Sequence, residues 1–243
     1  MSMETCQGQI LILHGWGASS SSWKKVKKLL DNLGFLTITP DLPGFGQEPE
    51  PIQTWDIDDY VEWVNQFCLK NNLTNFILLG HSFGGRLAIK FSVKYPQKIK
   101  KLILFSAAGV THRQKTKLSL LKLFSKTANI ILSLPVLNLL KKPLRKGFYG
   151  LLGTRDYYFL SSKVMLETFK KVIEDDLSSF LNKISIPTFI VWGEKDMLTP
   201  IQDAKLINKE IPNSILKIIP NSSHYLHTRE PEKLVEAIKD FLN

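Results

Sequence analysis

The sequence contains few of the features that mark secreted, fibrous or membrane-spanning proteins. It has only two cysteines in 243 residues, Cys6 and Cys68, which is too few for a disulfide scaffold, and we interpret both as free thiols. No apolar run reaches the roughly 18 residues of a membrane span. The first apolar segment, residues 10–13, is short and lacks the basic flank of a signal peptide. With 44% hydrophobic and 22% charged residues, the chain is expected to be a globular, cytoplasmic protein.

Acidic residues are absent from one long segment of the chain. Residues 111–146 contain nine lysines and arginines and no aspartate or glutamate, so this segment holds nearly all of the net charge of +10. A charge concentrated in one element argues against a nucleic-acid-binding protein, and no nucleic-acid partner is expected. It favours contact with an anionic lipid or an acidic carrier protein. The alternative is that the lysines only solvate the outer face of helices packed on the core.

Short apolar runs alternate with helical patterns along most of the chain. The predicted strands cover residues 9–13, 35–39, 75–79, 101–105, 188–192 and 214–219. The predicted helices between them cover residues 23–33, 55–69, 83–95, 201–210 and 231–242. This alternation predicts an α/β fold with a mostly parallel sheet of about six strands and helices on both faces. The alternation stops after Gly109 and resumes at Pro187, which indicates a helical insertion.

A glycine-flanked serine follows the third predicted strand. The motif Gly80-His81-Ser82-Phe83-Gly84 lies between a predicted strand and a predicted helix, which is the context of a nucleophile elbow. So sharp a turn forces the serine into a strained backbone conformation, and side chains at the glycine positions would clash. The context favours Ser82 as a nucleophile over the alternative, a tight glycine turn with an inert serine.

A serine nucleophile needs a base, which is usually a histidine oriented by a carboxylate. His224 follows the last predicted strand and Asp196 follows the strand before it. Because parallel strands end at one edge of a sheet, both lie at the same edge as the serine. Two alternatives stay open: Glu194 or Asp203 could supply the acid, and His227 could replace His224. Neither histidine belongs to a cluster with metal-ligand spacing, so we expect no metal and no other cofactor.

On these motifs the chain resembles the α/β-hydrolase fold superfamily over essentially its whole length. Residues 14–17, His-Gly-Trp-Gly, resemble the oxyanion loop of that family, and residues 41–46 resemble its Asp-x-x-Gly-x-Gly turn. Residues 193–200 and 221–224 resemble the loops that carry the catalytic acid and the catalytic histidine, although the family often has a glycine where this chain has asparagine and serines. The order Ser, Asp, His along the chain also matches.

The resemblance implies three groups of site residues. The catalytic triad would comprise Ser82, Asp196 and His224. The oxyanion hole would be formed by the main-chain N–H groups of Trp16 and Phe83. Substrate binding is predicted for His14, Gly15 and His81. The two histidines in this last group have a structural alternative, as hydrogen-bonding groups of glycine turns, and neither receives a proton-transfer role.

Two departures from the family pattern affect the prediction. Only eight residues precede Gln9, so the strand hairpin that usually comes before the oxyanion strand is missing, and we expect six strands rather than eight. Residues 110–186 lie where the family places its helical lid, and residues 1–109 with 187–243 would form the hydrolase core. Within this lid, residues 127–140 carry no charge, so they would either line an acyl-chain pocket or pack on the core.

These features predict a serine hydrolase that cleaves small-molecule carboxylic esters of short to medium acyl chain through an acyl-enzyme on Ser82. The enzymatic alternatives with the same triad are a pimeloyl-acyl-carrier-protein methyl ester esterase-like enzyme, a lipase and a C–C hydrolase. A ligand receptor built on the hydrolase fold is the alternative without turnover. Sustained turnover of simple esters would distinguish the enzyme from the receptor.

Overall fold

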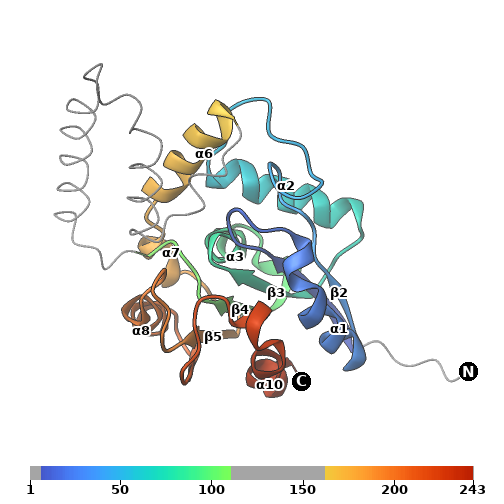
Figure 1. Cartoon of the computed structure of the whole chain (residues 1–243), viewed down its shortest axis with the longest axis vertical. Coiled ribbons are helices and arrows are strands. Elements are labelled where there is room, and N and C mark those ends of the chain that lie inside the picture. Colours follow the sequence, from blue (N-terminus) through green and yellow to red (C-terminus); the bar gives the residue numbers. More distant parts are fainter. Residues whose placement is uncertain (1–6, 111–161, 243) are drawn as a thin grey trace, which may run out of the picture. The chain divides into compact units, whose positions relative to one another are not determined.

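The sheet at the centre of the protein has six strands, all of them parallel. The computed structural model describes residues 7–110 and 162–242 (Figure 1). The spatial order of the strands is β2-β1-β3-β4-β5-β6. Their bounds are Gly8–Leu13 (β1), Phe35–Ile38 (β2), Phe76–His81 (β3), Ile99–Phe105 (β4), Thr188–Gly193 (β5) and Ile215–Ile219 (β6). The predicted fold class, a parallel sheet of about six strands, is confirmed.

The inner strands are buried on both faces, which is why they appear in the sequence as continuous apolar runs. Every residue of β3 is buried, and Leu78 lies opposite Leu11 of β1 and Leu102 of β4. The strand β6 lies at one edge, and its outer position leaves Ile215 exposed. The sheet therefore supplies a rigid central layer from which the loops at its carboxyl edge project.

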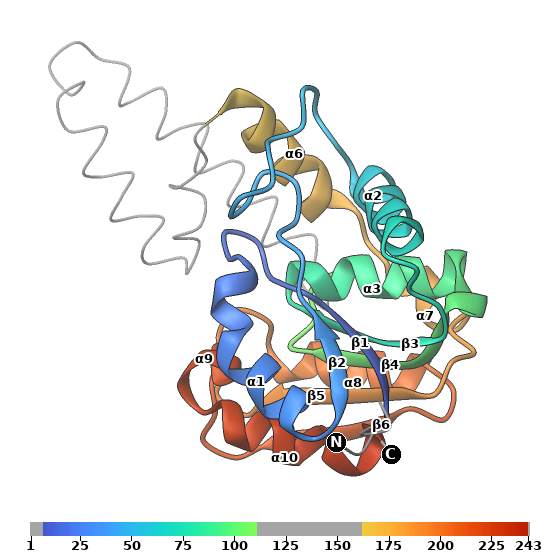
Figure 2. The same ribbon diagram turned by 90° about the vertical axis from the view of Figure 1, so that its right-hand side faces the viewer.

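Helices cover both faces of this sheet, as Figure 2 shows for α1 and α10 on one side and α2 and α3 on the other. The first layer consists of α1 (Lys24–Asn32), α9 (Leu226–Arg229) and α10 (Pro231–Leu242). The second layer consists of α2 (Ile57–Lys70), α3 (Phe83–Lys94), α7 (Ser178–Leu181) and α8 (Ile201–Glu210). Two short 3₁₀ turns cover Ser20–Trp23 and Pro96–Lys98. The helices predicted from sequence periodicity match these within about two residues at most ends.

The main apolar core lies between the sheet and the first layer of helices. Side chains alternate along a strand, so Ile10 and Ile12 of β1 face this layer and join Trp23, Leu30 and Ile238 in one buried cluster. All five side chains are at most 1% exposed. Burying a side chain of this size contributes roughly 1.5–3 kcal/mol, so this layer holds α1 and α10 firmly on the sheet.

The helix α2 is fixed at its start and along its length. Asp56 accepts a hydrogen bond from the N–H of Asp59, and the Asp59 carboxylate accepts one from the N–H of Asp56, which forms a capping box. Further along, Tyr95 at the end of α3 donates to Glu62 at 2.5 Å, and this hydrogen bond lowers the pKa of Glu62 to about 2. These contacts lock α2 against α3, the helix that follows the glycine-flanked serine.

The helix α6 (Lys163–Glu174) belongs to the same compact unit as the sheet. The chain divides into one unit of residues 1–110 with 162–243 and a second of residues 111–161. The predicted insertion, residues 110–186, includes α6. The buried Arg86 of α3 donates to the carbonyl oxygens of Val172 and Asp175 at 2.8 and 2.7 Å, at the end of this helix. The basic segment 111–146 and its predicted partners lie outside the described residues.

In the part of the chain that the structure describes, no helix is long and apolar enough to cross a lipid bilayer. Cys68 lies on α2 as a fully buried free thiol, and burial raises its pKa to about 11. A thiol in that state is not a nucleophile near neutral pH, in agreement with its assignment as a core residue. Cys6 lies outside the described residues.

Candidate active site

The residues singled out in the sequence gather at the carboxyl edge of the parallel sheet. Residues 14–17 follow β1, Ser82 follows β3, Asp196 follows β5 and His224 follows β6. In an open parallel sheet the strand ends on this edge border a common crevice. Candidate residues that are far apart in the sequence therefore lie at the same edge of the sheet.

Ser82 occupies the sharp turn between β3 and α3. Its backbone angles, φ 52° and ψ −112°, lie in a region that residues other than glycine rarely adopt. The two flanking glycines allow this turn: a Cβ on Gly80 would lie 2.4 Å from the carbonyl oxygen of Gly84, and a Cβ on Gly84 would lie 2.1 Å from that of Leu13. The motif therefore has the backbone geometry of a nucleophile elbow.

The turn after β1 lies against the serine. A Cβ added to Gly15 would lie 3.4 Å from the Cβ of Ser82, so the two turns are in close contact. The N–H of Gly84 donates to the carbonyl oxygen of His14 at 3.0 Å and joins the turn to the start of α3.

Two main-chain donors near Ser82 are unused. In the described part of the chain, the N–H groups of Trp16 and Phe83 donate to no main-chain or side-chain acceptor. Phe83 is the first residue of α3, where the helix dipole favours negative charge. The structure thus leaves both predicted oxyanion donors available.

Asp196 and His224 form a hydrogen-bonded pair. The Nδ1 of His224 lies 2.7 Å from Oδ2 of Asp196, and the two residues are 4% and 5% exposed. The other oxygen of the carboxylate, Oδ1, accepts from the main-chain N–H groups of Leu198 and Thr199, both at 2.9 Å. The hydroxyl of Thr199 lies 2.9 Å from Oδ2 and 3.2 Å from His224 Nδ1. The carboxylate is thereby held in one orientation toward the histidine ring.

The charge state of Asp196 follows from these contacts. Burial alone would raise the pKa of its carboxyl, but the hydrogen bond and charge of His224 and the main-chain donor of Thr199 together lower the pKa below its ordinary value. An ionised carboxylate only accepts hydrogen bonds, so Nδ1 of His224 carries a proton. In the neutral ring this leaves Nε2 with its lone pair, which is the tautomer that a general base requires.

The alternatives for the acid and the base do not share this geometry. Glu194 accepts a hydrogen bond from the N–H of Asn221 at 2.9 Å, and Asp203 lies one turn into α8. His227 stacks on Trp23 with ring centroids 4.6 Å apart, and its Nδ1 has no hydrogen-bond partner among the described residues. The carboxylate–histidine pair in the structure is therefore Asp196 with His224.

The two histidines predicted to bind substrate contact the protein itself. Nε2 of His14 accepts from the N–H of Leu42 at 2.9 Å, and its Nδ1 donates to the carbonyl oxygen of Gly15 at 2.8 Å. Both ring nitrogens of His14 are thus engaged by the main chain, and the ring supports the 41–46 turn. His81 is 3% exposed, and its Nε2 donates to the carbonyl oxygen of His224 at 3.1 Å.

The turn at 41–46 is held by an aspartate. Asp41 accepts from the N–H of Ser20 at 2.6 Å and from the N–H of Gln47 at 2.8 Å. Gly46 has φ 59°, and a Cβ there would overlap the Asp41 carboxylate. The Asp41 carboxylate can occupy this position only because residue 46 has no side chain. Together the two residues fix the loop that carries Phe45.

An aromatic cluster surrounds Trp16, whose N–H is one of the two predicted oxyanion donors. Its ring lies 4.9 Å from that of Phe45, 5.1 Å from Phe83 and 5.0 Å from Phe169 of α6. The ring of Tyr60 packs edge-on against that of Phe83, with centroids 5.0 Å apart. Sequence reasoning missed Phe169, because it lies in the segment predicted as part of the lid and its partner Trp16 is 153 positions away. This cluster makes the surroundings of the serine apolar.

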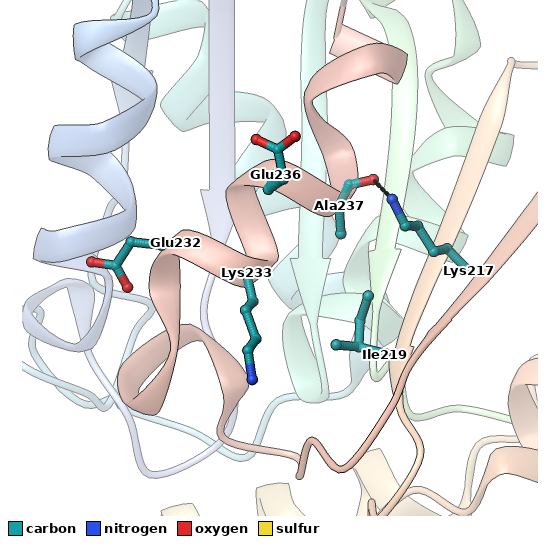
Figure 3. A pocket seen from close by; sticks show the side chains of 6 residues that line it. All are labelled: Lys217, Ile219, Glu232, Lys233, Glu236 and Ala237. Atoms are coloured by element: carbon teal, nitrogen blue, oxygen red, sulfur yellow. Dashed lines mark hydrogen bonds between the residues drawn. The ribbon is translucent and has the colours of Figure 1, made fainter.

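A hollow of about 500 Å³ lies elsewhere, between β6 and α10 (Figure 3). Its lining residues are Lys217, Ile219, Glu232, Lys233, Glu236 and Ala237. Lys217 donates across it to the carbonyl oxygen of Ala237 at 3.3 Å. None of these residues belongs to the candidate site. Among the described residues, no three His, Cys, Asp or Glu side chains are arranged to hold a metal ion.

Comparisons with known proteins agree with this arrangement. The family model of the alpha/beta hydrolase fold matches residues 9–231. Human monoacylglycerol lipase ABHD6 is 28% identical over 96% of this chain and 74% of its own length. The AB hydrolase superfamily protein YisY of Bacillus subtilis is 29% identical over 96% of this chain and 91% of its own.

Solved structures give the same assignment. An esterase from Exiguobacterium antarcticum superimposes with a TM-score of 0.76 at 25% identity, covering 97% of this chain and 91% of that one. A bromoperoxidase from Bacillus anthracis superimposes with a TM-score of 0.77 at 23% identity, over 97% of this chain and 91% of its own, and shows the shared fold. The chain belongs to the alpha/beta hydrolase fold family, with esterases and lipases among its relatives.

Proposed function

We propose that the protein is a serine carboxylesterase that works through an acyl-enzyme on Ser82. The observation that carries this proposal is the placement of the strained Ser82 at the same sheet edge as the buried Asp196–His224 pair. His81 adjoins the serine in sequence, and its ring centroid lies 4.7 Å from that of His224. This ring contact supports a position of His224 close to the turn that carries Ser82.

In the proposed reaction, Oγ of Ser82 forms a bond to the ester carbonyl carbon while Nε2 of His224 takes the serine proton. The negative oxygen of the tetrahedral intermediate accepts from the N–H groups of Trp16 and Phe83. When the carbon–oxygen bond breaks, His224 returns that proton to the leaving alcohol. Asp196 stays ionised and stabilises the histidinium. Water then attacks the acyl-enzyme with His224 as base, which releases the carboxylic acid and restores the serine.

The aromatic cluster around Trp16 favours a substrate with an apolar acyl group. Trp16, Phe45, Phe83 and Phe169 offer hydrocarbon surface beside the oxyanion donors and few polar groups. We propose acyl chains of short to medium length, because Phe169 of α6 closes on Trp16. A second candidate, hydrolysis of monoacylglycerols, is favoured by the 28% identity with monoacylglycerol lipase ABHD6.

The test is steady-state hydrolysis of p-nitrophenyl esters from acetyl to palmitoyl, with glycerol monoesters of the same acids alongside. The proposal expects turnover that peaks at short or medium chains and falls by about 10⁴-fold or more in Ser82→Ala. Ser92→Ala is the matched control, because Ser92 is a buried serine of α3 that only donates to the carbonyl oxygen of Ile89. A Ser82→Ala protein that hydrolyses these esters at the wild-type rate would refute the mechanism.

A further inference from the structure

The buried imidazole of His81 has no part in the chemistry described above. It is the last residue of β3 and precedes Ser82 directly. It lies in a cluster of rings in which Phe105 stacks at 4.7 Å, His227 lies at 4.5 Å and His224 at 4.7 Å. A polar ring in such an apolar setting costs free energy unless it makes a specific contact.

The specific contact of His81 is with the loop that carries the base. Its Nε2 lies 3.1 Å from the carbonyl oxygen of His224, which is 143 positions away in the chain. A carbonyl oxygen can only accept, so Nε2 carries the ring proton and Nδ1 is bare. Among the described residues this Nδ1 has no hydrogen-bond partner, so the tautomer is set by the bond to His224 alone.

The unprotonated Nδ1 side of the His81 ring lies against the turn after β1, which carries Trp16. A Cβ on Gly15 would lie 3.2 Å from Nδ1 of His81 and 3.4 Å from the Cβ of Ser82. One side chain therefore contacts the turn after β1 and the loop after β6, and its own backbone is continuous with the nucleophile. These are the three segments whose spacing decides whether serine, base and oxyanion donors meet.

His81 stays neutral through its surroundings. Burial lowers its pKa well below the ordinary value for histidine, and the nearby His227 and His224 lower it further. A second positive charge beside His224 would oppose the histidinium that forms in the proposed reaction. A neutral donor at this position holds the loop without adding that charge.

We propose that His81 is a positioning residue, which holds the His224 loop at reacting distance from Ser82 through its Nε2–H bond to the His224 carbonyl oxygen. This rests on the proposed function, since it assigns His81 a task for the same site. The role needs one N–H donor at the position of Nε2, and it does not need an ionisable ring.

Three substitutions at this position separate the donor from the ring. His81→Gln places an amide N–H close to the Nε2 position, His81→Asn is shorter and reaches only the Nδ1 position, and His81→Leu has no donor. Misplacement of a catalytic group by about 1 Å costs up to about 100-fold in rate. We expect kcat to fall about 10- to 100-fold in the Asn and Leu variants and less than about 5-fold in the Gln variant, with KM within about twofold throughout.

His227→Phe is the matched control. His227 is equally buried, at 2% exposure, and belongs to the same ring cluster. Its expected effect is on thermal stability, with kcat kept. Thermal melting of all five proteins shows whether each variant is folded, and the Gln against Asn comparison remains informative even where His81→Leu does not fold.

A second readout follows the nucleophile directly. The second-order rate of Ser82 modification by a fluorophosphonate depends on His224 as base, and it should fall in the Asn and Leu variants and recover in the Gln variant. Equal kcat and equal labelling rates for folded Gln, Asn and Leu variants would overturn the inference. Absence of both labelling and ester turnover in the wild-type protein would instead refute the proposed function.

Discussion

At the scale of single residues, the orientation of the proposed acid, Asp196, is determined by the hydrogen bonds that its two oxygens accept. Oδ1 of Asp196 accepts two main-chain N–H groups, while Oδ2 faces Nδ1 of His224. In Asp196→Asn the main-chain donors keep the amide oxygen on their side, so the NH₂ group faces His224. The histidine must then carry its proton on Nε2, where it cannot accept one from Ser82.

We expect Asp196→Asn to lower kcat by about 10⁴-fold with little change in KM, because only the tautomer of the base changes. Ester hydrolysis at saturating substrate measures this. The control is Glu194→Gln, since the amide oxygen of glutamine can still accept from Asn221 and the residue lies on the same loop. A larger loss in Glu194→Gln than in Asp196→Asn would reassign the acid.

Gly193 ends β5 and shows how tightly the acid loop and the histidine loop are packed. A Cβ there would lie 2.5 Å from the carbonyl oxygen of Ser222 and 2.8 Å from that of Ser223. We expect Gly193→Ala to push the 221–224 turn away, to destabilise the fold by about 1–3 kcal/mol and to lower kcat at least tenfold. Urea unfolding and ester hydrolysis on the same samples test both effects. Unchanged stability would show that the turn moves freely.

The sequence allowed a prediction of the reacting groups because their local context is distinctive. A serine between two glycines at a strand–helix junction can be found from neighbours alone, and so can an aspartate and a histidine after buried strands. His81 was predicted to bind substrate, with a structural role as a hydrogen-bonding group of its glycine turn as the alternative. Its main partner is the His224 carbonyl oxygen, and a contact across 143 positions leaves no local pattern in the sequence.

At the scale of elements, the six strands of the sheet were predicted, and the start of β4 was misplaced where lysines interrupt the apolar pattern. The strand β4 starts at Ile99, two residues before the predicted start, although Lys100 and Lys101 interrupt the apolar pattern. Nζ of Lys101 donates to the carbonyl oxygens of Phe241 and Leu242 at the end of α10. The amine of Lys101 thus binds the last carbonyl oxygens of α10. A pattern of apolar and polar residues treats any lysine as exposed, so it does not predict this role.

The helix α6 was predicted to lie in the insertion because the alternation of strands and helices stops after Gly109 and resumes only at Pro187. The side chain of Arg86 binds the end of this helix. Its guanidinium is buried between α3 and the end of α6, which lowers its pKa to about 10. We expect Arg86→Met to leave the carbonyl oxygens of Val172 and Asp175 without their donor, at a cost of about 1–3 kcal/mol each.

The consequence for α6 can be measured by limited trypsin digestion. Lys163, Lys170 and Lys171 provide cleavage sites on the helix, and cleavage there should be faster in Arg86→Met than in the wild-type protein. Arg86→Lys keeps one donor group and should lie between the two. Equal digestion rates in all three would show that α6 is held by its other contacts, such as Trp16 with Phe169.

At the scale of the whole molecule, the interior carries a group that should make stability depend on pH. Burial lowers the pKa of His227 from 6.5 to about 3, and the charge of His224 adds to the effect. The unfolded chain binds a proton near pH 6.5 while the folded chain does not, so lowering the pH favours unfolding. The free energy of unfolding should fall as the pH drops from about 6.5 toward 3, by at most roughly 1.4 kcal/mol per pH unit for this group.

The variant His227→Phe keeps the ring that stacks on Trp23 and removes the titrating group. Its unfolding free energy should therefore depend less steeply on pH between about 6.5 and 3 than that of the wild-type protein, while the two converge in slope above pH 7. Some dependence should remain, because burial also lowers the pKa of His81. Urea unfolding at a series of pH values measures both slopes. Identical slopes would mean that His227 gains its proton without unfolding, which requires that water reach the ring through an opening of α9 against the 3₁₀ turn that carries Trp23.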